Sequence, residues 1–190
     1  MNAQVAACQI GRRRLVSLAE KYGSEKIKYI FSELLDRSEI MTRDAIKGLP
    51  NGTFSHVDYL DNDGVDLDVA IKINVSVKID DDEIYLDFTG TNKQVNGPFN
   101  LMPSGSYAAA YFAVHAMIDA DVPINGGCFR PISLKLPERS ILNPEEPAAV
   151  NARTSTMKRV AGCITSALGK ADPPRAVADA AGELLLLAFG

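Results

Sequence analysis

The sequence predicts an α+β fold, in which an N-terminal helical hairpin precedes a largely antiparallel sheet with helices packed on one face. Two observations support this class. Apolar residues first follow helical spacing, and after Asn51-Gly52 their period changes from 3.6 to 2. Alternating segments are then interleaved with two helical segments, 104–118 and 155–168. We therefore expect a helical hairpin over residues 1–50 and an α+β domain over residues 51–190.

The two N-terminal helices are predicted from apolar spacing and from glycine. The apolar side chains of the first helix are Val5, Cys8, Leu15, Leu18 and Tyr22. Gly23 follows as a C-terminal stop, because glycine adopts the left-handed conformation that ends many helices. Ser24 is a candidate N-cap for the second helix, which ends before Gly48 and Pro50.

An antiparallel hairpin is the clearest prediction within the sheet. Apolar and polar residues alternate from Leu67 to Ile79 and again from Ile84 to Phe88. The polar turn Asp80-Asp81-Asp82 connects them. Its aspartates lack the interleaved spacing, the glycine and the closing glutamate of an EF-hand, so an acidic turn is favoured over a calcium loop. A further strand is predicted over residues 132–136.

Composition indicates a globular protein and argues against nucleic-acid binding. The chain has 46% hydrophobic and 23% charged residues, with a net charge of −4. Its basic run, Arg12-Arg13-Arg14, lies on a predicted helix and is interpreted as a solvated face, with phosphate binding as the alternative. No segment approaches the roughly 18 apolar residues of a membrane span. We therefore expect no nucleic acid and no membrane as partners.

Cysteine and histidine usage predicts no metal site. Cys8, Cys128 and Cys163 lack CxxC spacing, which fits a reducing cytoplasm. His56 and His115 are far apart in sequence, and no carboxylate accompanies them at helical spacing. His115 lies within an apolar helix and is interpreted as structural. Cys128 has no adjacent base, so a packed, inert thiol is favoured over a nucleophile.

Two loops flanking the apolar helix are the candidate substrate site. They concentrate Gly, Asn, Thr and Pro, which favour stiff turns with exposed polar groups. Gly126-Gly127 can present consecutive N–H groups to an anion, and Arg130 can pair with a carboxylate or phosphate. The alternative is a glycine bulge with Arg130 in a structural ion pair. The candidate substrate-binding residues are Thr89, Gly90, Thr91, Asn96, Gly97, Asn125, Gly126, Gly127 and Arg130, and no catalytic residue is assigned.

The sequence of these loops also resembles that of a known family. The motifs are Asp87-Phe88-Thr89-Gly90-Thr91, Gln94-Val95-Asn96-Gly97-Pro98, Pro123 to Pro131, Leu142-Asn143-Pro144 and Pro147-Ala148-Ala149-Val150. In order and spacing they are similar to the hydantoinase B/oxoprolinase family. This is the B-type chain of the ATP-dependent hydantoinases and 5-oxoprolinases, related to acetone carboxylase subunits. This chain differs from the family pattern at Asn151-Ala152-Arg153, where the family has a Gly-rich stretch.

The resemblance implies that this chain is the central part of a longer B-type chain. Chains of that type are much longer than 190 residues. The apolar run from Leu184 to Phe189 is therefore expected to pack against another part of the enzyme.

The resemblance also implies a reaction, the ATP-dependent ring opening of a cyclic amide such as hydantoin or 5-oxoproline. Phosphorylation of the amide oxygen makes a leaving group, and N–H pairs and arginine suit the negative charge that develops. The chain has no GxxxxGK[ST] motif, so no cofactor is expected in this segment, and ATP and Mg are expected on an A-type partner subunit or domain. The expected partners are that A-type subunit, the remainder of the B-type chain and the cyclic amide.

Two alternatives stay open. One is a non-catalytic assembly domain of the same complex, whose glycine loops and apolar C-terminal run contact protein and no substrate. The other is part of an ATP-dependent ketone carboxylase of the acetone type. As part of the cyclic amide hydrolase, the isolated segment is expected to be inactive.

Overall fold

The fold is seen in a computed structural model that describes residues 2–118, 121–178 and 180. The elements in chain order are α1 (Asn2–Tyr22), α2 (Ser24–Ile46), β1 (Gly52–Leu60), β2 (Ile71–Asp80), β3 (Glu83–Asp87), α3 (Pro103–Ile118), β4 (Ile132–Lys135), α4 (Arg153–Ala171) and the 3-10 turn η1 (Pro173–Arg175). The strands form one sheet in the order β1-β2-β3-β4. The first two pairings are antiparallel and the third is parallel. The predicted α+β class with a largely antiparallel sheet is confirmed.

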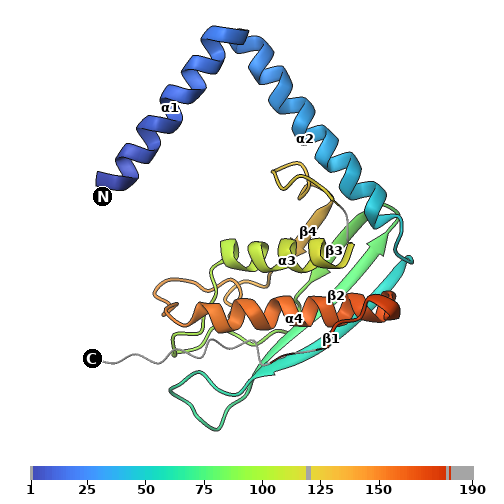
Figure 1. Cartoon of the computed structure of the whole chain (residues 1–190). Helices are drawn as coiled ribbons and strands as arrows, with labels where there is room; N and C mark the ends of the chain where they lie inside the picture. Colours follow the sequence, from blue (N-terminus) through green and yellow to red (C-terminus); the bar gives the residue numbers. More distant parts are fainter. Residues whose placement is uncertain (1, 119–120, 179, 181–190) are drawn as a thin grey trace.

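The core lies between the sheet and two helices, α3 and α4, which cover one face of it (Figure 1). Successive side chains of a strand point to opposite faces, so every second residue of β2 faces these helices. The inward residues are Ile71, Ile73, Val75, Val77 and Ile79, each at most 1% exposed. Burial of each such side chain stabilises the fold by about 1.5–3 kcal/mol. The apolar helix expected at 104–118 is therefore one wall of this core.

β2 begins four residues later than its alternating pattern suggests. The alternation starts at Leu67, but the strand starts at Ile71. The carboxylate of Asp63 accepts N–H hydrogen bonds from Val65 and Asp66, and a turn brings the Val69 N–H to the Asp66 carbonyl. These local bonds hold the segment as a loop, so the prediction of a strand from Leu67 was wrong at that end.

The two N-terminal helices meet at Gly23 and diverge as an open V (Figure 1). Gly23 has a φ of 86°, a conformation that glycine adopts easily, and it takes the N-cap position of α2 in place of the predicted Ser24. We call the sheet with α3 and α4 the body. α1 has no buried residue, whereas Ser38, Thr42 and Ile46 near the end of α2 are buried against the body. The division into residues 1–50 and 51–190 stays a prediction.

No helix in the described ranges is both long and apolar enough to cross a bilayer. The predicted packing of Leu184 to Phe189 concerns residues outside the described part of the chain.

Candidate functional site

The nine predicted site residues lie in two groups at opposite ends of the sheet. β3 and β4 are parallel, with Ile84 opposite Ile132 and Asp87 opposite Lys135. The loop 89–100 leaves the carboxyl end of β3, whereas the loop 125–130 precedes the amino end of β4. At about 3.3 Å per residue, a strand of this length separates the two ends by about 13–16 Å. One small molecule therefore does not contact both groups within this chain.

The turn at Thr89, Gly90 and Thr91 is held against Asn74 on β2. The Asn74 amide donates to the Thr89 carbonyl at 2.7 Å, and its backbone N–H donates to the Thr91 hydroxyl at 3.0 Å. That hydroxyl donates in turn to the Asn74 carbonyl at 3.1 Å. Gly90 has a φ of 94°, which strains any residue with a side chain. Structural contacts therefore occupy the Thr91 hydroxyl.

Asp87 closes the other side of this turn. Its carboxylate accepts the Thr89 N–H at 2.7 Å and pairs with Lys135 at 3.1 Å. Burial alone would raise the pKa of Asp87, but the hydrogen bonds from Thr89 and Lys135 outweigh it and lower the pKa. Asp87 thus stays ionised and orders the start of the loop.

Gly97 and Asn96 differ sharply in their surroundings. Gly97 is buried, its N–H donates to the Asp63 carboxylate at 2.9 Å, and a Cβ here would lie 1.7 Å from the Asp63 carbonyl oxygen. The N–H groups of Asp66, Gly97 and Val65 lower the pKa of Asp63. Asn96 is exposed, and its side chain makes no hydrogen bond to another described residue.

The second group is fastened to α2. The Asn125 amide donates to the Ser38 hydroxyl at 2.7 Å, while its oxygen accepts the Gly127 N–H at 2.8 Å. A Cβ on Gly127 would lie 1.8 Å from the Leu35 carbonyl oxygen, so only glycine fits this contact. Gly126 is exposed, and a Cβ there would meet only the Leu35 side chain at 3.7 Å.

Arg130 completes the attachment by two ion pairs with α2. Its Nη1 lies 2.7 Å from Asp36 and 2.8 Å from Glu39. Glu39 also pairs with Arg43 at 3.0 Å, and hydrogen bonds from Arg130 and then Arg43 lower its pKa. The structural ion pair that was the alternative for Arg130 is thus present. Substrate binding by Arg130 stays a prediction.

An apolar pocket of about 550 Å³ lies between α3 and this second loop. Tyr111 stacks on Phe129 with ring centroids 4.1 Å apart, and His115 meets Phe129 edge-on at 5.7 Å. Burial lowers the pKa of His115, and a backbone hydrogen bond with Cys128 offsets this in part. The His115 Nε2 is buried without a hydrogen-bond partner among the described residues. Because this nitrogen is sealed from the pocket surface, the pocket presents a hydrocarbon lining.

The described residues offer neither an accessible cysteine nucleophile at Cys128 nor a cluster of metal ligands. Cys128 is fully buried, and its thiol donates to the Asn125 carbonyl, as an inert packed cysteine would. Within the described ranges, no three His, Cys, Asp or Glu side chains come close enough to hold a metal ion.

Three residues that organise the loops were not identified from the sequence. Asn74, Asp63 and Ser38 hold the loops by hydrogen bonds, yet each lies far from its partner along the chain. Asn74 is simply one polar residue in an alternating strand. Its role in holding the loop is seen only from the pairing of β2 with β3, which places Asn74 opposite the turn at residues 89–91.

Comparison with known proteins gives the family of the chain. A family model described as hydantoinase B/oxoprolinase matches residues 1–190. An uncharacterized protein of Methanocaldococcus jannaschii is 35% identical over 185 residues, which are 97% of this chain and 32% of that protein. A Pseudomonas sp. (strain NS671) protein, provisionally named as the B-type subunit of a D-/L-hydantoinase, is 36% identical over 199 residues, covering 100% of this chain and 33% of its own length.

Solved structures agree with this assignment. The ATP-dependent caprolactamase from Pseudomonas jessenii superposes with a TM-score of 0.84 at 29% identity, over 92% of this chain and 30% of the other. A nucleotide-free acetone carboxylase superposes with a TM-score of 0.80 at 17% identity, over 90% of this chain and 24% of the other, which shows a shared fold. The chain spans about a third of the length of the curated relatives named above. The match over all residues and the close structural likeness show that this chain belongs to the hydantoinase B/oxoprolinase family.

Proposed function

We propose that this chain is a segment of the B-type subunit of an ATP-dependent hydrolase of cyclic amides. The observation that carries the proposal is the likeness to ATP-dependent caprolactamase over 92% of the chain. The relative named for a D-/L-hydantoinase supports it, because hydantoins and lactams share a ring amide. Both relatives are about three times longer, so the segment works as part of a larger assembly.

The chemistry of the substrate explains the need for ATP. An amide is a poor electrophile, and transfer of a phosphoryl group to its oxygen supplies a leaving group before water attacks. The described residues bring together no carboxylate cluster suited to Mg²⁺. On the likeness to an ATP-dependent caprolactamase, we assign ATP and Mg to an A-type partner subunit, and no step of phosphoryl transfer to this chain. The three cysteines are unpaired, which fits a cytoplasmic enzyme.

Within this assembly, the loop 89–100 is the better candidate to face the substrate. Asn96 is exposed with its amide unengaged by other described residues, and both its donor and its acceptor suit a cyclic amide. The turn before it is rigid, because Asn74 and Asp87 hold it by several hydrogen bonds. By contrast, the polar side chains of the loop 125–130 are bound to α2. We infer that this second loop positions α2.

The test is ATP-dependent phosphate release by the assembled A-type and full-length B-type chains, over a panel of 5-oxoproline, hydantoins and lactams. Asn96→Ala is expected to lower kcat/KM for the preferred cyclic amide by about tenfold or more, whereas Arg130→Ala changes it by less than about threefold. Lys93→Ala, an exposed neighbour on the same loop, is the matched control. Turnover that requires a ketone and bicarbonate would overturn the hydrolase proposal in favour of a carboxylase.

The assembly alternative is supported by the α2 contacts of Asn125 and Arg130. It predicts that Asn96→Ala has full activity, and that Arg130→Ala and Asn125→Ala first reduce the fraction of B-type chain that co-purifies with its partner. Size-exclusion chromatography of each variant complex, run beside the activity assay, separates the two cases.

A further inference from the structure

α1 presents a basic and apolar surface that nothing in the described part of the chain covers. None of its 21 residues is buried. Its large apolar side chains are 40–56% exposed and comprise Val5, Ile10, Leu15, Val16, Leu18 and Tyr22. Arg12, Arg13 and Arg14 make no ion pair with a described residue. We call this helix the basic arm.

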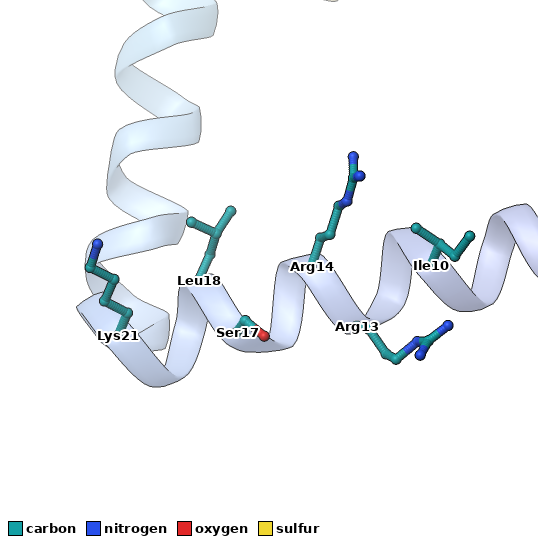
Figure 2. A pocket seen from close by; sticks show the side chains of 6 residues that line it. All are labelled: Ile10, Arg13, Arg14, Ser17, Leu18 and Lys21. Atoms are coloured by element: carbon teal, nitrogen blue, oxygen red, sulfur yellow. The ribbon is translucent and has the colours of Figure 1, made fainter.

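Part of the basic arm is hollowed beside the elbow with α2. The hollow measures about 560 Å³ and is lined by Ile10, Arg13, Arg14, Ser17, Leu18 and Lys21. Figure 2 shows Ile10, Arg14 and Leu18 pointing to the same side of the helix, as residues four apart do. Apolar and cationic groups therefore alternate along one face.

A helix in this situation is suited to a protein partner. Isolated helices gain little stability from their own backbone, and tertiary packing normally holds an apolar stripe. Contiguous exposed apolar side chains with charged neighbours mark interaction surfaces. The partner surface should be apolar and acidic, so that the arginines are neutralised and the aliphatic side chains are buried.

Such a surface lies on the chain itself, in the loop between β1 and β2. We call residues 61–69 the acidic edge. Asp61, Asp66 and Asp68 are exposed there and form no ion pair with a described residue. Val65, Leu67 and Val69 lie next to these aspartates in sequence and are 59%, 67% and 55% exposed. The edge contains no lysine or arginine. It therefore matches the basic arm in charge and in aliphatic character.

The arm and the edge of one molecule do not meet. α1 projects from the far end of α2, while the acidic edge lies at the opposite end of the body, below β1 and β2 in the view of Figure 1. The same chain thus displays two complementary surfaces, each without an intramolecular partner among the described residues.

We propose that the occupant of the basic arm is the acidic edge of a second copy of this chain. In a two-fold dimer each copy offers its arm to the edge of the other, so the contact forms twice. The pairing of arginines with aspartates sets the register, and burial of the aliphatic side chains stabilises it. This inference goes beyond the proposed function and does not depend on it, since the contact concerns only the association of B-type chains.

Charge reversal with rescue tests the proposal directly. The wild-type chain is expected to sediment as a dimer at about 0.05 M NaCl and to dissociate as salt rises to about 0.5 M, because exposed ion pairs are screened. R13E/R14E and D66K/D68K should each raise the dimer dissociation constant at least about tenfold. The quadruple variant R13E/R14E/D66K/D68K again has opposite charges on the basic arm and the acidic edge, and it should recover dimerisation. K26E/K93E, which makes the same net charge change as R13E/R14E at exposed lysines elsewhere, is the matched control.

Several outcomes would overturn the proposal. One is a wild-type chain that is monomeric at every concentration. The others are that R13E/R14E or D66K/D68K leaves the dimer intact, or that the variant with all four substitutions does not recover dimerisation. Circular dichroism of each variant is the control that checks whether the helices remain folded. The same variants in the full-length B-type chain should behave alike; if dimerisation there ignores both reversals, other parts of that chain cover these surfaces and the proposal fails.

Discussion

At the scale of single residues, the glycines of the loops show how one sequence signal has two structural causes. Gly97 and Gly127 were predicted to be substrate-binding residues, and a glycine lets a ligand come close to the backbone. In the structure the approaching group is the chain itself, through the carbonyls of Asp63 and Leu35. Glycine permits both, because it removes the Cβ whichever atom comes near. The identity of the approaching atom is decided by the fold.

Gly127→Ala is therefore expected to destabilise the chain by about 2–4 kcal/mol, because its Cβ cannot share space with the Leu35 carbonyl. The matched control is Gly126→Ala, whose Cβ meets only a side-chain carbon at 3.7 Å and should cost less than about 0.5 kcal/mol. Urea unfolding of both variants measures the difference. Equal effects at the two positions would show that the loop does not rest on α2 in this way.

His115 predicts a pH dependence of stability. Its folded-state pKa lies below the ordinary 6.5, chiefly because of burial. The unfolded chain therefore binds the proton first, and stability falls as the pH drops through 6.5 toward the folded-state value. Stability measured by urea unfolding should decline less in His115→Phe than in the wild type between about pH 7.5 and 5.5. Parallel curves for the two proteins would contradict this.

At the scale of elements, α2 is joined to the body by a small network of charges. Arg130 pairs with Asp36 and Glu39, and Arg43 joins Glu39 to the β2–β3 turn through Asp82. Glu39 thus lies between two arginines, which explains the lowered pKa of its carboxyl. The network and the Gly127 contact hold the middle of α2, while its first half projects with α1.

Arg130→Ala is expected to loosen the middle of α2 without unfolding the body. The ion pairs of Arg130 are exposed to solvent, which screens them, so the global free energy of unfolding should change little. Amide hydrogen exchange should quicken at residues 34–39 and stay unchanged in β2. Arg139→Ala, which removes an exposed ion pair with Glu145, is the control and should leave α2 unaffected. Unchanged exchange in α2 would mean that the Gly127 contact alone is enough to hold the middle of this helix in place.

At the scale of the whole molecule, the body and the basic arm differ in how many side chains they bury. The body buries a continuous core between the sheet, α3 and α4, which the end of α2 joins through Ile46. The basic arm buries nothing. An arrangement of this kind suits a segment that associates with other protein through its projecting helix.

Deletion of residues 1–22 is therefore expected to shift the melting temperature by less than about 3 °C under conditions where the chain is monomeric. Deletion through Ile46 should instead abolish cooperative unfolding, because it removes the buried end of α2. Calorimetry of the two truncated chains makes the comparison. A large loss on removing α1 alone would show that the arm contributes to the core.

The sequence by itself determined the fold class, the strand pairing around Asp80-Asp81-Asp82 and the family. These depend on local periodicity, turn residues and motif order, which are written along the chain. Only the tertiary structure decided that the two predicted loops lie at opposite ends of β3 and β4, and that Asn125 and Arg130 contact α2. Contacts such as Arg130 with Asp36 join residues almost a hundred positions apart, and no local pattern specifies them. In the sequence, residues that bind a substrate therefore cannot be told apart from residues that hold a loop in place, and only the folded structure separates the two.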